Sequence, residues 1–258
     1  MNNFRKKINE LAAIMKLNAF LNIDQNYEVT ENVEEIIYEI LKNQYEMNMI
    51  KSESRRIKRA GFKQLKTFDT FEFNQERLPN LDFENVKRIA TCEFINDHEN
   101  IIIIGPPGFG KTHLSTAIGI EAAKKGYRVI YKTASQLTTE MYEKASEKKL
   151  LSFIRYLGRV DFLILDDMGY AQYDQKMQTA LFDLINARNE VKSTCFISNV
   201  NITEWIKFMP DKNLLSAMLD RIIYHATVFN MINDDQSQSY RRKNTKIFKK
   251  KGKNGLKK

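Results

Sequence analysis

Continuously apolar segments alternate with amphipathic segments along most of this chain. Apolar runs are typical of parallel strands covered on both faces, and apolar residues at three- and four-residue spacing indicate helices. The expected strands are residues 101–104, 128–132, 162–165, 194–198 and 226–230. The expected helices are residues 113–125, 135–145, 148–158, 175–191, 203–208 and 214–223. The pattern therefore predicts an α/β fold, with a parallel sheet of about five strands in a three-layer α/β/α arrangement.

A different pattern precedes this alternation. Between Val33 and Tyr45, apolar residues recur at helical spacing, and residues 1–66 as a whole are read as helical. Residues 67–79 form a phenylalanine-rich connector that ends at a proline, and residues 81–97 again predict a helix. We expect a small helical N-terminal domain over residues 1–66, an α/β domain over 67–240 and a basic tail over 241–258.

A glycine-rich loop joins the first strand to the following helix. It reads Gly105-Pro-Pro-Gly-Phe-Gly-Lys-Thr112 and has the spacing of a phosphate-binding loop, whose backbone N–H groups surround phosphates at a helix N-terminus. Lys111 is expected to reach the β- and γ-phosphates, and the Thr112 hydroxyl to coordinate Mg²⁺. The expected nucleotide contacts are Gly105, Pro106, Pro107, Gly108, Phe109, Gly110, Lys111, Thr112 and His113.

Two consecutive acids end the apolar run that begins at Phe162. A carboxylate at the carboxyl end of a parallel strand lies beside the phosphate loop, so Asp166 is expected to hold Mg²⁺ or its water shell. Asp167 follows directly and is expected to orient and deprotonate the attacking water, which would make the site hydrolytic. A solvated turn residue is the alternative for Asp167.

Two further polar residues have candidate roles that the pattern leaves open. Asn199 ends the strand expected at 194–198, where its amide can position water against a γ-phosphate or simply occupy a turn. Arg221 lies near the end of a predicted helix. It is either an arginine finger for a neighbouring subunit or a cation that the helix dipole favours at this end. The histidines share no metal-like spacing, so His113 is expected to pack or face solvent, and Trp205 to belong to the core.

Positive charge is confined to two segments of the chain. The net charge is +9, with ten Lys and Arg in residues 241–258 and seven in residues 51–66. Both segments flank an acidic remainder, which favours a polyanionic partner over a solvated helix face and a solubilising tail. A membrane surface is less well supported, because neither segment has a strong amphipathic apolar face. The expected nucleic-acid contacts are Arg55, Arg56, Lys58, Arg59 and Lys63.

Composition limits the cellular setting. The chain has two cysteines, without disulfide-framework or metal-ligand spacing, which favours a reducing cytoplasm. No segment has the length of a membrane span, and the first twenty residues lack the apolar core of a signal peptide. We therefore expect a cytoplasmic protein without a membrane partner.

Taken together, these residues resemble those of IstB-type ATPases, the helper proteins of bacterial insertion sequences, in the AAA+ branch shared with DnaC-type helicase loaders. The phosphate loop specifies only the superfamily. The family resemblance depends on three motifs that follow it in order. They are Ser198-Asn199 with Glu204-Trp205, then Leu219-Asp-Arg221, then Ser239-Tyr-Arg241.

The resemblance implies a role for each matching residue. Lys111 and Thr112 would bind phosphates and Mg²⁺, with Asp166 as the Mg²⁺ acid and Asp167 as the hydrolytic acid. Among the later motifs, Asn199 would be a sensor, Arg221 an arginine finger and Arg241 a second sensor that touches the nucleotide. The cofactors would be ATP and Mg²⁺.

Two departures from the AAA+ pattern bear on these roles. Many relatives carry Glu where Asp167 stands, which puts the rate of hydrolysis in question, though not nucleotide binding. Only 28 residues follow Asn230, too few for a separate helical lid, so the second-sensor role would fall to Arg241.

The resemblance favours a transposition helper that assembles on double-stranded DNA with ATP, as a ring or filament, and recruits a transposase to a target site. One alternative is a DnaC-like loader whose partner is a replicative helicase. Another is an ATP-switched DNA-binding protein with little turnover. A small-molecule kinase is least supported, because it would leave the basic segments unexplained.

Overall fold

The computed structural model describes residues 3–21, 31–169, 171–233, 235 and 239–240. The chain divides into two compact units, Met1–Arg55 and a second unit that begins at Arg56. Helix α3, Glu31–Ala60, passes from one into the other. None of the described helices is both long and apolar enough to cross a membrane.

The first unit is helical, as the spacing predicts. It contains α1 (Asn3–Met15), the short 3₁₀ helix η1 (Asn18–Phe20) and the first part of α3. Its core contains Ile8, Ala12 and Leu41. Arg5 approaches Glu34 to 2.6 Å, and this carboxylate is almost fully buried, so the ion pair fastens α1 to α3.

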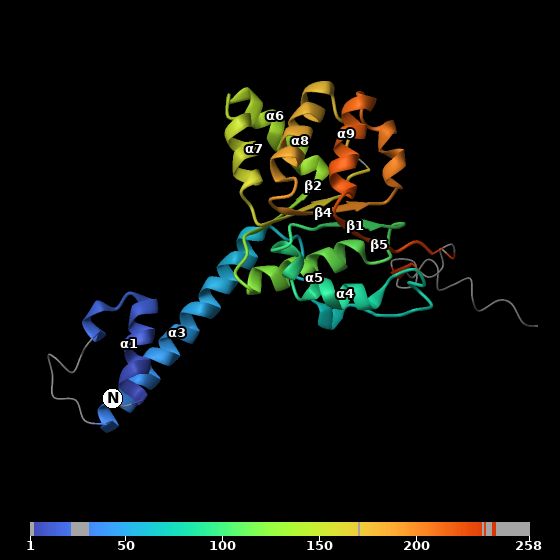
Figure 1. The fold of residues 1–258 in the computed structure, drawn as a ribbon. Helices are drawn as coiled ribbons and strands as arrows, with labels where there is room; N and C mark the ends of the chain where they lie inside the picture. The colour runs from blue at the N-terminus through green and yellow to red at the C-terminus, as the bar shows by residue number, and fades with distance from the viewer. Residues whose placement is uncertain (1–2, 22–30, 170, 234, 236–238, 241–258) are drawn as a thin grey trace, which may run out of the picture. The chain divides into compact units, whose positions relative to one another are not determined.

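The second unit contains a parallel sheet of five strands in the order β2-β3-β4-β1-β5 (Figure 1). Each strand pairs in parallel with its neighbours, which confirms the predicted sheet. The two neighbours of β1 in the sheet, β4 and the edge strand β5, both come later in the chain, so crossover connections build the sheet. The strands are β1 (Asn100–Ile104), β2 (Val129–Thr133), β3 (Phe162–Asp166), β4 (Ser193–Ser198) and β5 (Ala226–Asn230).

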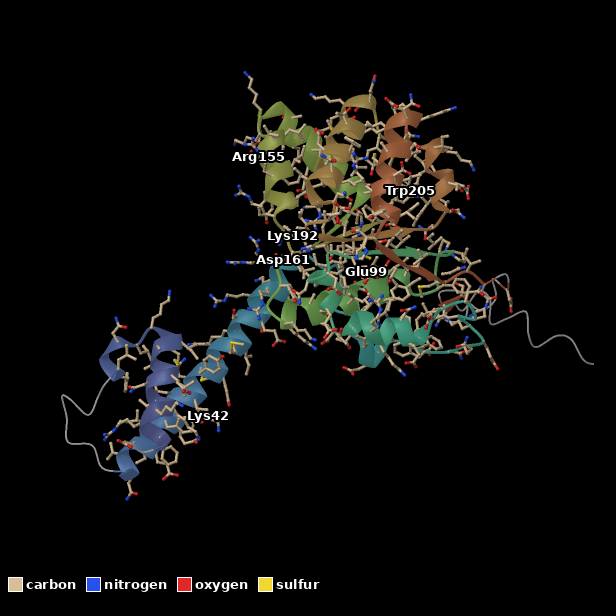
Figure 2. The ribbon with its side chains drawn as sticks, in the orientation of Figure 1. Lys42, Glu99, Arg155, Asp161, Lys192 and Trp205 are labelled. Carbon is tan, nitrogen blue, oxygen red and sulfur yellow. The ribbon has the colours of Figure 1, made fainter. Side chains whose placement is uncertain are left out.

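Helices cover both faces of the sheet, which gives the three expected layers (Figure 1). Ile101 and Ile103 face the core beneath α4 and α5, whereas Ile102 faces the core shared with α6 to α9. Trp205 is fully buried in that second core, as predicted (Figure 2). The covering elements are α4 (Phe83–Ala90), α5 (Lys111–Lys124), α6 (Ala134–Ser146), α7 (Leu150–Gly158), α8 (Gln175–Arg188), η4 (Ile202–Lys207) and α9 (Lys212–Ile223).

The helix expected over residues 81–97 is shorter than predicted. Asp82 caps it by accepting hydrogen bonds from the backbone N–H groups of Glu84 and Asn85, so α4 begins at Phe83. It ends at Ala90 because Cys92 has a φ of 62°, in the left-handed region that interrupts a right-handed helix. The chain continues as a separate 3₁₀ turn, η3 (Glu93–Ile95).

A buried arginine organises the edge of the sheet where β3 and β4 begin. Arg188 donates to the carbonyls of Leu157, Val160 and Ser193 and to the Thr194 hydroxyl, at 2.6 to 2.8 Å. Nearby, Lys192 and Asp161 form an ion pair of 2.7 Å (Figure 2). Arg188 therefore joins the end of α7 to the start of β4 through buried groups.

We expect Arg188→Ala to lower the free energy of unfolding by about 3 kcal/mol, because it leaves several buried acceptors unsatisfied. Chemical denaturation followed by circular dichroism measures the loss. Arg155→Ala is the matched control, because Arg155 is exposed on α7 (Figure 2), and it should change stability by less than about 0.5 kcal/mol. Equal stability of the two variants would show that the Arg188 network contributes nothing.

Candidate nucleotide-binding site

The phosphate loop follows β1 at the carboxyl edge of the sheet, with the backbone that its sequence predicts. Gly108 and Gly110 have φ values of 90° and 96°, which residues with a side chain rarely adopt. At Gly105, an added Cβ would lie 2.7 Å from the Met231 carbonyl oxygen. Glycine is therefore required at Gly105 for close approach of the backbone and at the other two positions for conformation.

Helix α5 points its N-terminus at this loop. Gly110 precedes the helix and provides no side-chain cap, so the positive end of the helix dipole faces the loop. Lys111 is 6% exposed, and its Nζ donates to the Pro106 carbonyl at 3.0 Å. The ammonium is thus held across the loop, in position to contact a phosphate.

The carboxylate of Asp166 connects three elements. Its Oδ2 accepts hydrogen bonds from the hydroxyls of Thr112, at 2.8 Å, and Tyr131, at 2.7 Å, and its Oδ1 accepts the Asp167 N–H. Asp166 is 2% exposed. Burial, followed by the charge of Asp166, raises the pKa of Tyr131, so this phenol stays a proton donor.

The Thr112–Asp166 pair fits a bound Mg²⁺. Both groups supply oxygen, which Mg²⁺ prefers, and Mg²⁺ in such sites is held by one or two protein groups with phosphates and water. Among the described residues, no group of three or more His, Cys, Asp and Glu side chains is placed to hold a metal. An ion at this site would therefore depend on the phosphates of a nucleotide for its remaining ligands.

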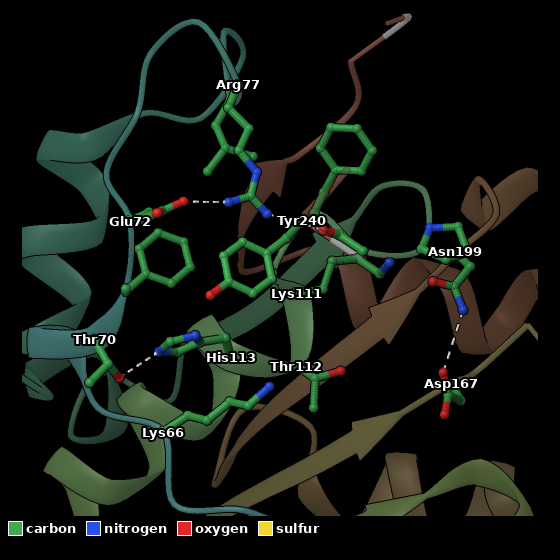
Figure 3. Close-up of a pocket in the computed structure, with 16 residues that line it drawn as sticks. Lys66, Thr70, Glu72, Arg77, Lys111, Thr112, His113, Asp167, Asn199 and Tyr240 are labelled. Carbon is green, nitrogen blue, oxygen red and sulfur yellow. Dashed lines mark hydrogen bonds and ion pairs between the residues drawn. The ribbon is translucent and has the colours of Figure 1, made fainter. Parts of the chain in front are cut away.

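Asp167 and Asn199 come together at the end of the cavity beside Thr112. The Asn199 amide donates to Asp167 Oδ1 at 3.4 Å (Figure 3). Asp167 has a φ of 59°, in the left-handed region that residues other than glycine adopt uncommonly. Burial, then repulsion from Asp166, raises the pKa of Asp167, whereas Asn199 and the charges of Lys63 and Lys111 oppose the rise.

These residues line a cavity of about 510 Å³. Its opposite wall contains Arg77, which donates to Glu72 at 2.9 Å and to the Gly108 carbonyl at 3.0 Å (Figure 3). The Tyr240 ring lies 4.9 Å from the Arg77 guanidinium. The backbone N–H of Tyr240 also donates to the Gly108 carbonyl, at 2.9 Å. The lining residues are Lys66, Thr70, Phe71, Glu72, Arg77, Leu78, Pro107, Gly108, Phe109, Gly110, Lys111, Thr112, His113, Asp167, Asn199 and Tyr240.

Sequence reasoning did not predict the wall formed by Lys66, Thr70, Glu72, Arg77 and Leu78. Lys66 was visible only as part of the basic segment. The sequence offered no signal for Arg77, because its position depends on how the connector folds over the loop.

His113 anchors that connector. Its Nε2 donates to the Thr67 carbonyl at 2.9 Å, and its ring meets Phe71 edge-on at 5.2 Å between centroids. Burial, the largest cause, and the charges of Lys66 and Arg77 lower the pKa of His113. Its imidazole packs as expected, and it also borders the cavity.

Of the predicted nucleotide-site residues that the structure describes, four do not line this cavity: Gly105, Pro106, Asp166 and Arg221. Arg221 donates to the Asn186 side chain at 3.0 Å and to the Ala217 carbonyl at 2.7 Å, and it stacks on Phe182. It thus lies on the side of the unit formed by α8 and α9. Arg241, the expected second sensor, lies outside the described residues.

The predicted nucleic-acid residues have different environments. Arg55, Lys58, Arg59 and Lys63 are exposed. Arg56 instead donates to the carbonyls of Ala123, at 2.7 Å, and Lys124, at 3.4 Å, in the last turn of α5. Its guanidinium therefore caps this helix, and the exposed residues are the ones available to a partner.

A phosphate loop after β1, an acid ending β3 and a parallel sheet in this strand order define a P-loop NTPase fold of the AAA+ class. The profile of the family described as IstB-like ATP binding protein matches residues 7–247. The chain belongs to this family.

Similar proteins agree with this assignment. The ATP-binding protein of insertion sequence IS5376 from Geobacillus stearothermophilus is 33% identical over 229 residues, which cover 88% of this chain and 89% of that protein. AMPPCP-bound DnaA from Aquifex aeolicus superposes with a TM-score of 0.54 at 27% identity, over 66% of this chain and 51% of that one. The DnaC helicase loader has a TM-score of 0.54 at 20% identity, over 64% of this chain and 95% of that one, and shows the shared fold.

The raised pKa of Asp167 predicts a stability effect. A carboxyl group with a higher pKa in the folded than in the unfolded state contributes stability below its unfolded pKa, and this contribution is lost as the pH rises through its folded pKa. We expect Asp167→Asn to raise the melting temperature at pH 7 by roughly 1–3 °C, because solvent screens part of the effect. The gain should shrink as the pH falls toward 4.

Thermal melts at several pH values measure this difference. Asp183→Asn, which removes an exposed carboxylate on α8, is the control and should show no such pH-dependent gain. A destabilised Asp167→Asn protein at pH 7 would contradict the prediction.

Proposed function

We propose that this protein binds and hydrolyses ATP, and that nucleotide binding drives its assembly on double-stranded DNA as a helper of transposition. The hydrogen bond between Thr112 and Asp166 carries the proposal. It joins the phosphate loop to the acidic end of β3, which is the arrangement that a nucleotide with Mg²⁺ requires.

The residues of the loop divide the work of binding. The backbone of Gly105–Thr112 and the N-terminus of α5 bind the phosphates, and Lys111 neutralises charge at the β- and γ-phosphates. Thr112 and Asp166 would hold Mg²⁺, which supplies positive charge to the terminal phosphates.

Hydrolysis requires a base and a positioned water. Asp167 lies beside Asp166 and has a raised pKa, which suits a group that accepts a proton from water. Asn199 donates to the same carboxylate and fixes its orientation. The Asp side chain is shorter than Glu, so we propose a slow turnover, suited to a protein whose nucleotide state times assembly.

Arg221 supports an oligomeric site. Arg221 is on α9 and does not line the cavity of its own chain. Any nucleotide phosphate that it contacts would therefore have to be bound by a neighbouring subunit. Stabilisation of transition-state charge by such an arginine is worth several orders of magnitude in rate. We propose that ATP closes an interface between subunits, which then form a ring or filament.

The exposed basic residues and the similarity to the ATP-binding protein of insertion sequence IS5376 support DNA as the partner. We propose that the assembly on DNA then recruits a transposase. Arg55, Lys58, Arg59 and Lys63 supply the described part of this surface. The fold shared with the DnaC helicase loader favours a second candidate, a loader that binds a replicative helicase. A tight complex with a helicase hexamer would support that candidate.

We expect double-stranded DNA to raise the steady-state ATPase rate of the native protein. The Asp167→Asn variant should still bind ATP but hydrolyse it about 100-fold more slowly, because it lacks the proposed base. Phosphate release measures hydrolysis, and DNA affinity measured in parallel should fall steeply with salt. No stimulation by DNA would contradict the helper function. Equal inactivity of the native protein and Asp167→Asn would instead favour an ATP-switched protein with little turnover.

Mixing two inactive variants tests the arginine finger. Lys111→Ala removes a residue of a subunit's own site, whereas Arg221→Ala removes the proposed contribution to a neighbour. Each alone should lose most activity, and an equimolar mixture should regain roughly a quarter of the native rate, because random pairing restores some intact interfaces. Without recovery in the mixture, Arg221 does not act between subunits.

A further inference from the structure

One lysine of the basic segment faces the cavity. Lys66 is half-buried and lines the cavity together with Lys111, Thr112 and His113. Figure 3 shows its side chain extending beneath His113, with the ammonium end toward Thr112. The exposed lysines of the same segment, such as Lys58, do not line this cavity.

The chain on both sides of Lys66 is anchored. On the N-terminal side, Phe62 packs against Tyr131, with ring centroids 6.1 Å apart, and fills the space beside Gly119. On the C-terminal side, the Thr67 carbonyl accepts the hydrogen bond from His113. The backbone at Lys66 is therefore held beside the first turn of α5, and its position does not depend on a ligand.

The other cations of the cavity already have partners. Arg77 donates to Glu72 and to the loop, and Lys111 donates to the Pro106 carbonyl. Within the described residues, Lys66 forms no hydrogen bond or ion pair. Its charge nevertheless reaches the first turn of α5, because it helps to lower the pKa of His113 after the larger effect of burial.

We infer that Lys66 is a second phosphate-binding lysine, which contacts the α- and β-phosphates from the side opposite Lys111. The loop and the first turn of its helix bind these two phosphates, whereas Lys111 reaches toward the γ-phosphate. Lys66 lines the cavity together with Thr112 and His113 of that turn, so its ammonium would meet the part of the nucleotide that ATP and ADP share. The inference rests on the proposed binding of ATP.

This placement gives the basic segment two functions. The exposed basic residues of the segment remain available to DNA. Lys66, its last residue, lies beyond the end of α3 and would bind the nucleotide. Bound nucleotide would then neutralise a cation of the segment itself.

Binding of ADP and of a non-hydrolysable ATP analogue to Lys66→Met tests the inference. We expect the dissociation constants for both nucleotides to rise about tenfold, by similar factors, because the lost contact is common to both. The KM for ATP should rise similarly while kcat changes by less than about twofold, since uniform binding is removed. Lys66→Arg should restore most of the affinity.

The matched control is Lys176→Met, which removes an exposed lysine charge on α8, away from the cavity lining, and should change both dissociation constants by less than about twofold. Melting temperatures of all variants show whether each is folded. Unchanged affinity in Lys66→Met, or a loss confined to the ATP analogue, would overturn the inference.

Lys111→Met separates this inference from the proposed function. If the native protein binds neither nucleotide, ATP binding itself fails. If Lys111→Met abolishes binding and Lys66→Met binds normally, only the role of Lys66 is wrong.

Discussion

The hydrogen bond from Thr112 to Asp166 constrains much of the second unit. It requires that the N-terminus of α5 and the end of β3 lie at the same edge of the sheet, which the parallel pairing of β3, β4 and β1 achieves. Asp166 is 2% exposed and Thr112 is half-buried at the edge of the cavity, so their separation depends on the packing of the core around them. Tyr131 adds a donor from β2, and three elements thus converge on one carboxylate.

The acidic pair at the end of β3 has a conformational and electrostatic cost. Asp167 combines a left-handed backbone with a carboxylate placed next to another acid. Neither feature helps the unit to fold, and both are tolerated because β3 and β4 are buried on both faces. Stability is supplied instead at the opposite edge of the sheet, where Arg188 satisfies three backbone carbonyls.

Local patterns predicted the elements and the centre of the site, because each signal lies within a few residues. The loop Gly105–Thr112 and the acids after Phe162 depend only on their own strands. The end of α4 was predicted wrongly, because the left-handed conformation at Cys92 has no sequence signature comparable to glycine. Arg77 could not be predicted, since its contacts with Glu72 and Gly108 arise only when the connector folds over the loop.

The contacts at Gly108 have a consequence for recognition. Its carbonyl accepts hydrogen bonds from both the Arg77 guanidinium and the Tyr240 N–H, so the loop is held from two directions by segments far apart in sequence. The loop is thereby preorganised, and ligand binding does not have to order it, which removes an entropic cost from association. Arg77 and Tyr240 thus connect nucleotide affinity to the connector before α4 and to the chain after β5.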